Sequence, residues 1–382
     1  MLNEIKTHIM KIKALVVFAM AFYMMSCSSI GRSTTDNYTI TVSGQTDNSE
    51  VEKTLNLSNF SGIESDVAVD IHYTPGAKYN VKVRAKREVL DKINISENGS
   101  VLMLKRKKGE GYANSNVVCK MVNGVTFYSG NTTQKKVTLY VTAPEINVLE
   151  NSGGDMQFHT KVFNSDGLRI SNNGAFKLNA ESLKCTDGDG LDIVNLGSLT
   201  IEVPTVDATW LSLDNTGSML FNSSDITGSL KMKNAGQLTF SGHVKGTTVE
   251  LNNSGMCQVN STFDLTDSYT CKTSGLSNND GDVTARTISI FNSGQEQRKG
   301  TLKADRLTID VDGNSQYAMS FIGDDAKLYC SGGGNFNFAL NCQSIDLNSD
   351  GYINVSLSGT ADKTSFEGSG ISHLNTSKLN KF

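Results

Sequence analysis

The acidic segment Asp187-Gly188-Asp189-Gly190-Leu191-Asp192 is the part of this sequence best suited to hold a metal ion. Its three carboxylates lie close together in a glycine-rich turn, and carboxylate oxygens are the ligands that calcium prefers. The segment lacks the distant bidentate glutamate of an EF-hand loop, so we prefer to interpret it as a polar corner between strands. Asp187, Asp189 and Asp192 are kept as a calcium hypothesis, and no cofactor is expected.

Trp210 is the only tryptophan and is predicted to face outward, beside inward-facing Leu211. An exposed tryptophan can be a binding hot spot or a platform on which a sugar stacks. An isolated aromatic residue on a surface also occurs without any function. We keep Trp210 as a candidate binding residue for a glycan or protein ligand.

Patterns typical of catalysis are missing from the sequence. His72, His159, His243 and His373 show no metal-ligand spacing, and no serine lies in a G-x-S-x-G elbow. An enzyme that cleaves polysaccharides needs paired carboxylates, or a base together with calcium, on one outer face. The sequence shows no such cluster, so we expect no enzyme. A carbohydrate-active β-helix enzyme, a polysaccharide lyase or hydrolase, is the alternative.

The charge balance excludes one class of partner. The chain of 382 residues has a net charge of −4 and a pI near 5.8, with 19% charged and 38% hydrophobic residues. No basic field exists to hold a phosphate backbone, so nucleic acid is not expected as a partner. The basic run from Lys105 to Lys108 is interpreted as a solvated strand edge rather than a contact with lipid or glycan.

Residues 1–26 are predicted to be a secretory signal, because lysines precede twelve apolar residues and a small residue follows them. Met24-Met25-Ser26-Cys27 resembles a bacterial lipobox, in which the cysteine becomes the lipidated first residue. Cys27 is therefore the predicted lipidation site, with a plain secretory signal as the alternative. Translation could begin at Met1 or at Met10.

A lipid anchor would attach the mature chain to a membrane, because two or more acyl chains hold a protein stably. Residues 27–50 are polar, lack apolar periodicity and are predicted to be a flexible tether. No second apolar run is present that could span a membrane. We expect an exported protein of a Gram-negative envelope, anchored to the outer membrane on its periplasmic or cell-surface side.

Glycines recur at intervals of mostly 19 or 20 residues, with apolar residues four before and two and four after them. Alternation of period two indicates strands, and a repeat of this length indicates a solenoid. We predict an all-β protein, a single right-handed parallel β-helix whose cysteines after the signal lie mostly in the core. The glycines are Gly153, Gly174, Gly197, Gly217, Gly236, Gly255, Gly275, Gly294, Gly313, Gly332, Gly351 and Gly370.

An asparagine lies two residues before many of these glycines and shares the inward parity of the core. We predict that these asparagines stack from coil to coil, each amide bonding the next amide and the turn backbone. Glycine is expected at the corner because it accepts a positive φ. The predicted ladder consists of Asn172, Asn195, Asn215, Asn234, Asn253 and Asn292.

Residues 51–382 are predicted to form one domain. Residues 51–148 would be an irregular cap with the opening coils, and residues 149–375 the regular coils. Asn98-Gly99 between two alternating runs predicts a hairpin. Gly109 to Gln134 would be a long excursion from the cap.

Three cap segments carry a family resemblance: Leu57-Ser58-Asn59-Phe60-Ser61-Gly62-Ile63, Val67-Ala68-Val69-Asp70-Ile71 and Tyr79-Asn80-Val81-Lys82-Val83. In this order they resemble the start of the putative auto-transporter adhesin head domain called GIN. The later Asn-x-Gly coils are similar to the β-helical body of that family, and the resemblance covers roughly residues 55–375. It implies an adhesive role at a surface.

These observations predict a non-catalytic exported lipoprotein with an adhesin-like β-helical head that binds or scaffolds at the cell envelope. Besides the enzyme alternative, a third interpretation is an envelope stress or assembly factor that binds no extracellular ligand.

Overall fold

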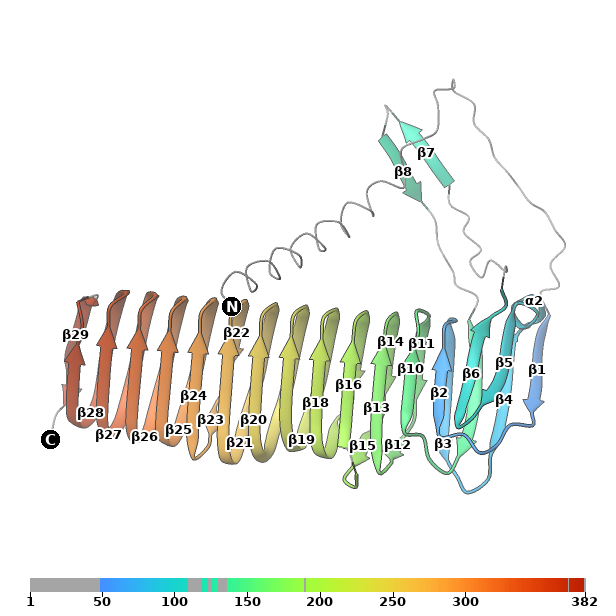
Figure 1. Ribbon diagram of the computed structural model, residues 1–382, viewed down its shortest axis with the longest axis horizontal. Coiled ribbons are helices and arrows are strands. Elements are labelled where there is room, and N and C mark those ends of the chain that lie inside the picture. Colours follow the sequence, from blue (N-terminus) through green and yellow to red (C-terminus); the bar gives the residue numbers. More distant parts are fainter. Residues whose placement is uncertain are drawn as a thin grey trace, which may run out of the picture. The chain divides into compact units, whose positions relative to one another are not determined.

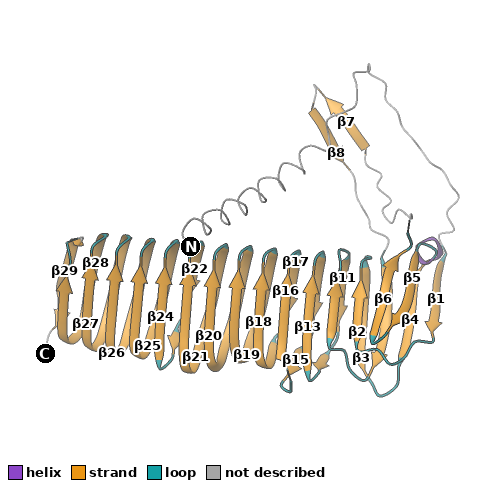
Figure 2. Cartoon of the chain, viewed as in Figure 1, coloured by secondary structure: helices purple, strands orange, loops and turns teal. Residues whose placement is uncertain are grey.

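In the residues that the computed structural model describes, the chain is all-β apart from the short helix α2 (Arg87–Leu90) (Figure 2). No helix in the described part of the chain is long and apolar enough to cross a membrane. The predicted signal peptide, Cys27, nearly all of the predicted tether and most of the predicted excursion lie outside the described residues. The structure describes residues 49–108, 118–122, 125–129, 136–188, 190–369 and 371–380.

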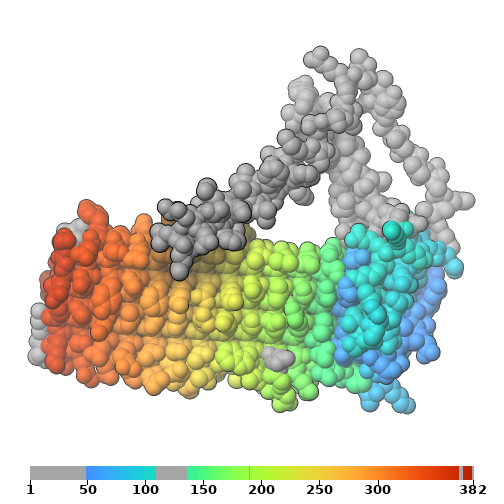
Figure 3. Space-filling model, viewed as in Figure 1, coloured from blue at the N-terminus to red at the C-terminus, as the bar shows by residue number. Residues whose placement is uncertain are grey.

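The strands wind into a parallel β-solenoid of about 12 turns, which confirms the predicted parallel β-helix (Figure 1). Successive coils pair in register, so that Leu213 lies beside Met232 and Met232 beside Leu251. Each position of the repeat therefore becomes a column of residues along the axis, with a spacing of about 4.8 Å. In the space-filling view the coils follow one another in chain order (Figure 3).

The earlier coils consist of short strands separated by corners. Their inward positions alternate with outward ones, as in β13, where Leu168, Ile170 and Asn172 are buried. These strands are β10 (Val148–Asn151), β11 (Asp155–His159), β12 (Val162–Asn164), β13 (Gly167–Asn172), β14 (Ala175–Asn179), β15 (Ser182–Cys185), β16 (Gly190–Asn195), β17 (Ser198–Glu202) and β18 (Thr205–Asn215).

In most later coils one long strand bends from one glycine corner to the next. These coils share one continuous apolar core with the earlier ones. The strands are β19 (Ser218–Asn234), β20 (Gln237–Asn253), β21 (Met256–Thr273), β22 (Leu276–Asp280), β23 (Val283–Thr284), β24 (Thr287–Asn292), β25 (Gln295–Val311), β26 (Asn314–Cys330), β27 (Gly333–Ser349), β28 (Tyr352–Glu367) and β29 (Ile371–Asn380).

Antiparallel strands close the N-terminal end of the solenoid. β2 and β3 lie parallel to β10 and β11, whereas β4 and β5 run antiparallel to β9 and β6. The predicted hairpin is confirmed, because Asn98 pairs with Val101 and Gly99 has a φ of 59°. The cap strands are β1 (Glu50–Leu55), β2 (Gly62–Ser65), β3 (Val69–Pro75), β4 (Asn80–Lys86), β5 (Ile93–Asn98), β6 (Val101–Arg106) and β9 (Val137–Ala143), and a separate hairpin contains β7 (Val118–Val122) and β8 (Val125–Ser129).

The corner glycines have a different cause from the one expected. Gly236 and most other glycines of its column do not have a positive φ. A Cβ on Gly236 would instead overlap the carbonyl oxygen of Gly217 on the preceding coil. The corner therefore needs glycine because successive backbones approach one another too closely for a side chain.

Asparagine side chains stack inside the corners. Asn172 Nδ2 donates to Asn195 Oδ1 at 2.7 Å and also to the carbonyl of Gly174 at 3.0 Å. Thr273 occupies the column after Asn253, and Asn292 beyond it donates to the Ser315 hydroxyl at 2.8 Å. The uninterrupted amide ladder contains Asn151, Asn172, Asn195, Asn215, Asn234 and Asn253.

The cysteines whose side chains are described are free thiols. As predicted, most of them face the core, and only Cys257 is partly accessible. Burial raises the pKa of the Cys185 thiol to about 12, so this group stays protonated and unreactive. The buried members are Cys185, Cys271, Cys330 and Cys342.

Candidate functional site

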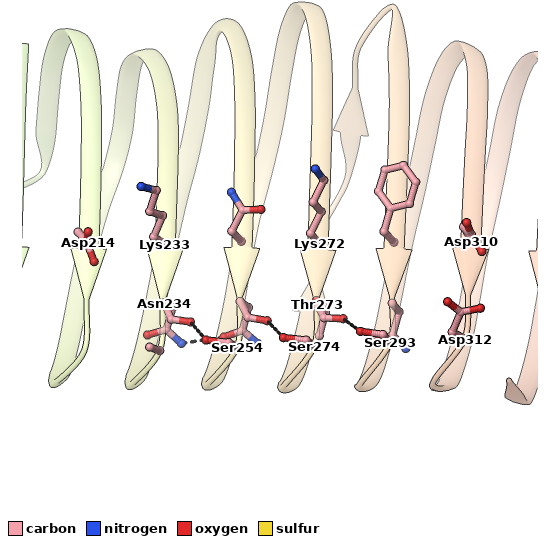
Figure 4. Close-up of a pocket in the computed structure, with 15 residues that line it drawn as sticks. Asp214, Lys233, Asn234, Ser254, Lys272, Thr273, Ser274, Ser293, Asp310 and Asp312 are labelled. Carbon is pink, nitrogen blue, oxygen red and sulfur yellow. Dashed lines mark hydrogen bonds between the residues drawn. The ribbon is translucent and has the colours of Figure 1, made fainter. Parts of the chain in front are cut away.

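A groove of about 500 Å³ runs along the outer face of the strands just before the Asn-x-Gly corner (Figure 4). Parallel register brings one residue from each of six successive coils into a single row along it. From β18 to β25 the row reads Asp214, Lys233, Asn252, Lys272, Phe291 and Asp310.

Two lysines give the centre of the groove its positive charge. Lys233 and Lys272 flank Asn252, and within the described residues neither ammonium group forms an ion pair. Lys272 Nζ lies 5.8 Å from the centre of the Phe291 ring, a cation–π distance. The amide of Asn252 donates to Glu250 Oε1 at 2.9 Å, which orients its own oxygen atom.

Hydroxyl groups line the corner side of the groove. Ser254 donates to the Asn234 carbonyl at 3.3 Å, and Ser274 and Ser293 make the same contact with the preceding coil at 3.5 Å. Figure 4 shows this row of hydroxyls below the lysines. Each hydroxyl keeps lone pairs that can accept a hydrogen bond from a ligand.

Carboxylates stand at the ends of the groove. Burial and the neighbouring Asp312 raise the pKa of Asp310 above its ordinary value. The groove thus combines ammonium, amide and hydroxyl groups with an aromatic ring, between acidic ends. This set suits a ligand that has a central anionic group and an apolar face.

The predicted candidates lie elsewhere. Trp210 on β18 is 51% exposed and does not line this groove. Asp187 is exposed and Asp192 is half-buried on β16, while Asp189 lies outside the described residues. In the part of the chain that the structure describes, no group of three acidic, histidine or cysteine residues could hold a metal ion. The roles of Trp210 and of the three aspartates stay predictions.

The structure also brings a base between two carboxylates on adjacent coils. His243 Nε2 lies 2.7 Å from Asp264 Oδ2, and its Nδ1 lies 3.9 Å from Asp225 Oδ1. This corrects the expectation that no such cluster exists, because the members are far apart in sequence and only the coil register joins them. All three side chains are partly exposed and none lines the groove.

A second histidine cluster covers the junction of cap and coils. The His72 ring stacks between Tyr140 and His159, at 5.2 Å from each ring centre. His159 Nε2 lies 3.0 Å from Asp70 Oδ1, and Lys136 Nζ lies 3.6 Å from Asp70 Oδ2. Burial, which outweighs the attraction of Asp70, lowers the pKa of His159. Sequence spacing could not show this cluster because strands β3, β9 and β11 meet only in the fold.

The basic run of the cap is used within the protein. Lys105 pairs with Glu64, and Arg106 Nε lies 3.8 Å from Asp66 Oδ1. Lys107 Nζ donates to the carbonyl of Asp91 at 2.6 Å. These contacts support the interpretation of the run as a strand edge and leave it little charge for an external ligand.

The parallel coils define a β-helical protein that carries its polar groups on long outer faces. Residues 59–218 match the family model described as "Putative auto-transporter adhesin, head GIN domain". The resemblance expected from the sequence is confirmed over these residues, and the description of the family names an adhesin and no enzymatic activity. A comparison with curated proteins finds no match.

Solved structures of proteins described as putative adhesins are similar to this chain. One from Bacteroides fragilis is 15% identical with a TM-score of 0.32 and covers 71% of this chain and 97% of its own. One from Parabacteroides distasonis is 13% identical with a TM-score of 0.28 and covers 84% and 98%. One from Parabacteroides merdae is 11% identical with a TM-score of 0.24 and covers 86% and 97%.

Proposed function

We propose that the protein is a non-catalytic exported lipoprotein whose β-helical head binds or scaffolds at the cell envelope. The groove of Figure 4 carries this proposal, because it gathers binding groups from six coils into one continuous row. The ammonium groups of Lys233 and Lys272 form no ion pair with any described residue, and they favour a ligand with a carboxylate or sulfate group. Phe291 lies beside Lys272 and offers a ring against which a sugar can pack.

Binding is tested with the full mature chain carrying Cys27→Ala, so that the protein is soluble without lipid. Acidic glycans and matrix proteins are titrated while soluble products are assayed in the same samples. We expect saturable binding to an acidic ligand without products. Lys233→Ala/Lys272→Ala should weaken it at least about tenfold, because two charge-assisted contacts are lost.

Lys327→Ala is the matched control, since Lys327 is exposed but does not line the groove. If Lys327→Ala weakened binding as much, the loss would be due to the change in net charge and not to the groove. Release of cleaved glycan, or no binding to any member of the panel, would contradict the proposal.

The lipid anchor has its own test. Wild-type protein expressed in a Gram-negative host should incorporate labelled palmitate and sediment with membranes. Cys27→Ala should do neither. Release of unlabelled wild-type protein would contradict lipidation of Cys27 and would indicate a plain secretory signal.

A carbohydrate-active enzyme is the second candidate, and Asp310 favours it. A carboxyl group with a raised pKa beside Asp312 in a groove has the character of a general acid. The Asp225–His243–Asp264 cluster is the other place to look. Product release that is abolished by Asp310→Asn, but not by Asp225→Asn, would establish this alternative at the groove.

A further inference from the structure

A second row of side chains lies on the outer face just after the glycine corner of the coils. The register between coils places an amide side chain at the same position in six successive coils. The strands that carry them, β21, β22 and β25 to β28, are labelled in Figure 1. All six side chains are exposed. This row, called the amide row, contains Gln258, Asn278, Gln297, Gln316, Asn335 and Asn354.

Most of the amide row has no hydrogen-bond partner among the described residues. Asn354 donates to Asn335 Oδ1 at 3.1 Å. The amides of the other four members make no hydrogen bond within the described residues. Each of them therefore presents donors and an acceptor to the solvent. A groove of about 440 Å³ runs along the row from Gln258 to Gln316.

The surroundings of the row carry almost no charge. Among the outward residues two positions before and after each amide, only Asp280 and Lys299 are charged, and they are register neighbours of opposite sign. Three apolar side chains on the same flank are well exposed: Met256 at 49%, Leu276 at 47% and Tyr352 at 77%.

We propose that the amide row binds a neutral polysaccharide strand that lies along the axis of the β-helix. Amides that donate and accept match sugar hydroxyls, which do both, and a neutral face complements a ligand without charge. A charged polymer would find only Asp280 and Lys299 here, whose opposite charges lie side by side on neighbouring coils. The row repeats at about 4.8 Å over six coils, so a ligand that also repeats can make many weak contacts at once.

The exposed apolar side chains complete this chemistry. Sugar rings have C–H faces as well as hydroxyl groups, and Met256, Leu276 and Tyr352 offer apolar surface to them. The amide row lies after the corner glycines, whereas the groove that contains Lys233 and Lys272 lies before them. The two grooves share no lining residue. The proposal therefore stands or fails separately from acidic-ligand binding at that groove.

The test measures binding of laminarin, mannan and dextran to the mature chain carrying Cys27→Ala by affinity electrophoresis. Polygalacturonate and heparin serve as acidic comparisons. We expect at least one neutral polysaccharide to bind and Gln297→Met/Gln316→Met to weaken that binding at least about tenfold, because methionine keeps the length of glutamine without its hydrogen bonds. Affinity for oligosaccharides of the bound polymer should rise with length up to roughly the six coils of the row.

Two controls make the outcome decisive. Asn173→Met/Asn348→Met changes two exposed amides away from the row and should leave binding intact. Lys233→Ala/Lys272→Ala should also leave neutral binding unchanged, while it weakens acidic binding.

Three results would overturn the proposal. The first is the absence of neutral binding, and the second is equal loss in the control variants. The third is a dimer in sedimentation that Gln297→Met/Gln316→Met dissociates, because the row would then be an interface between two copies.

Discussion

Arg298 Nη2 lies 2.7 Å from Glu296 Oε1 in the core of the β-helix, and both side chains are almost completely excluded from water. The two residues are two positions apart on β25, so both point inward. The Tyr317 hydroxyl donates to Glu296 Oε2 at 2.6 Å, and Asn279 Nδ2 donates to Glu296 Oε1 at 2.7 Å. Neighbouring coils therefore hold this ion pair in place.

Removing one partner of the pair should be costly. Arg298→Met leaves the Glu296 carboxylate buried without its cation, and we expect a loss of about 3–5 kcal/mol in the free energy of unfolding. Urea unfolding followed by circular dichroism measures it. The double variant Glu296→Leu/Arg298→Met should lose less than the single variant. A double variant that loses as much or more would show that the pair is not the source of the effect.

The close approach of successive corners predicts a sharp difference between two glycines. Gly236→Ala would place a methyl group on the carbonyl oxygen of Gly217, so the backbone must shift. We expect a loss of about 3 kcal/mol or more, or a failure to fold. At Gly333 the nearest atom to an added Cβ is the Tyr352 oxygen at 3.4 Å, so Gly333→Ala is the control. Similar melting temperatures for both variants would contradict this account.

The asparagine ladder should contribute to stability through its middle members. Asn215→Ala removes the donor that Asn234 Oδ1 accepts at 2.7 Å and the acceptor that Asn195 uses at 2.7 Å. Buried groups that lose a partner cost about 1–3 kcal/mol, and we expect a loss in this range in urea unfolding. Asn348→Ala, an exposed amide, should change stability by less than about 0.5 kcal/mol. An equal loss in both variants would rule out the ladder as the cause.

The cap should lose stability in acid through Glu64. Burial raises the pKa of this carboxyl, but the hydrogen bonds from Lys105 and Ser152 outweigh it, so the pKa lies below its ordinary value of 4.5. The contribution is therefore present above pH 4.5 and is lost as the pH falls through the folded pKa. Glu64→Gln should lower the melting temperature at pH 7 and have no effect near pH 2. Glu181→Gln, at an exposed carboxyl, should have no effect at either pH. A constant difference between wild type and Glu64→Gln at all pH values would contradict the prediction.

The repeat made most of the fold predictable. Period-two alternation around each glycine predicts strands, and the inward parity of residues such as Asn215 predicts the burial that the structure shows. The same parity applies to Glu296 and Arg298, two and four residues after Gly294, and could have identified the buried ion pair. The reason why the corners require glycine could not be predicted from the sequence of one coil, because it depends on the distance between the backbones of successive coils.

The candidate site was harder to predict from the sequence. Its residues come from equivalent positions on successive coils and not from one continuous segment. Lys233, Lys272 and Phe291 have nothing in common within their own coils, and only the register between coils makes them a row. The same is true of His243 and Asp264. Irregular coils also make it hard to predict from sequence spacing which residues lie side by side, because the register of β18 shifts between Asp207 and Trp210.

Because equivalent coils stack on one another, each repeat in the gene corresponds to a fixed length of the β-helix. Since each coil contacts only its neighbours, duplication or loss of a single repeat in the gene would move the far end of the β-helix by about 4.8 Å without altering either terminus of the fold. A duplication within the coils that carry Gln297 and Gln316 would lengthen the amide row in the same step. The reach of such a protein and the number of contacts it can make would then evolve together.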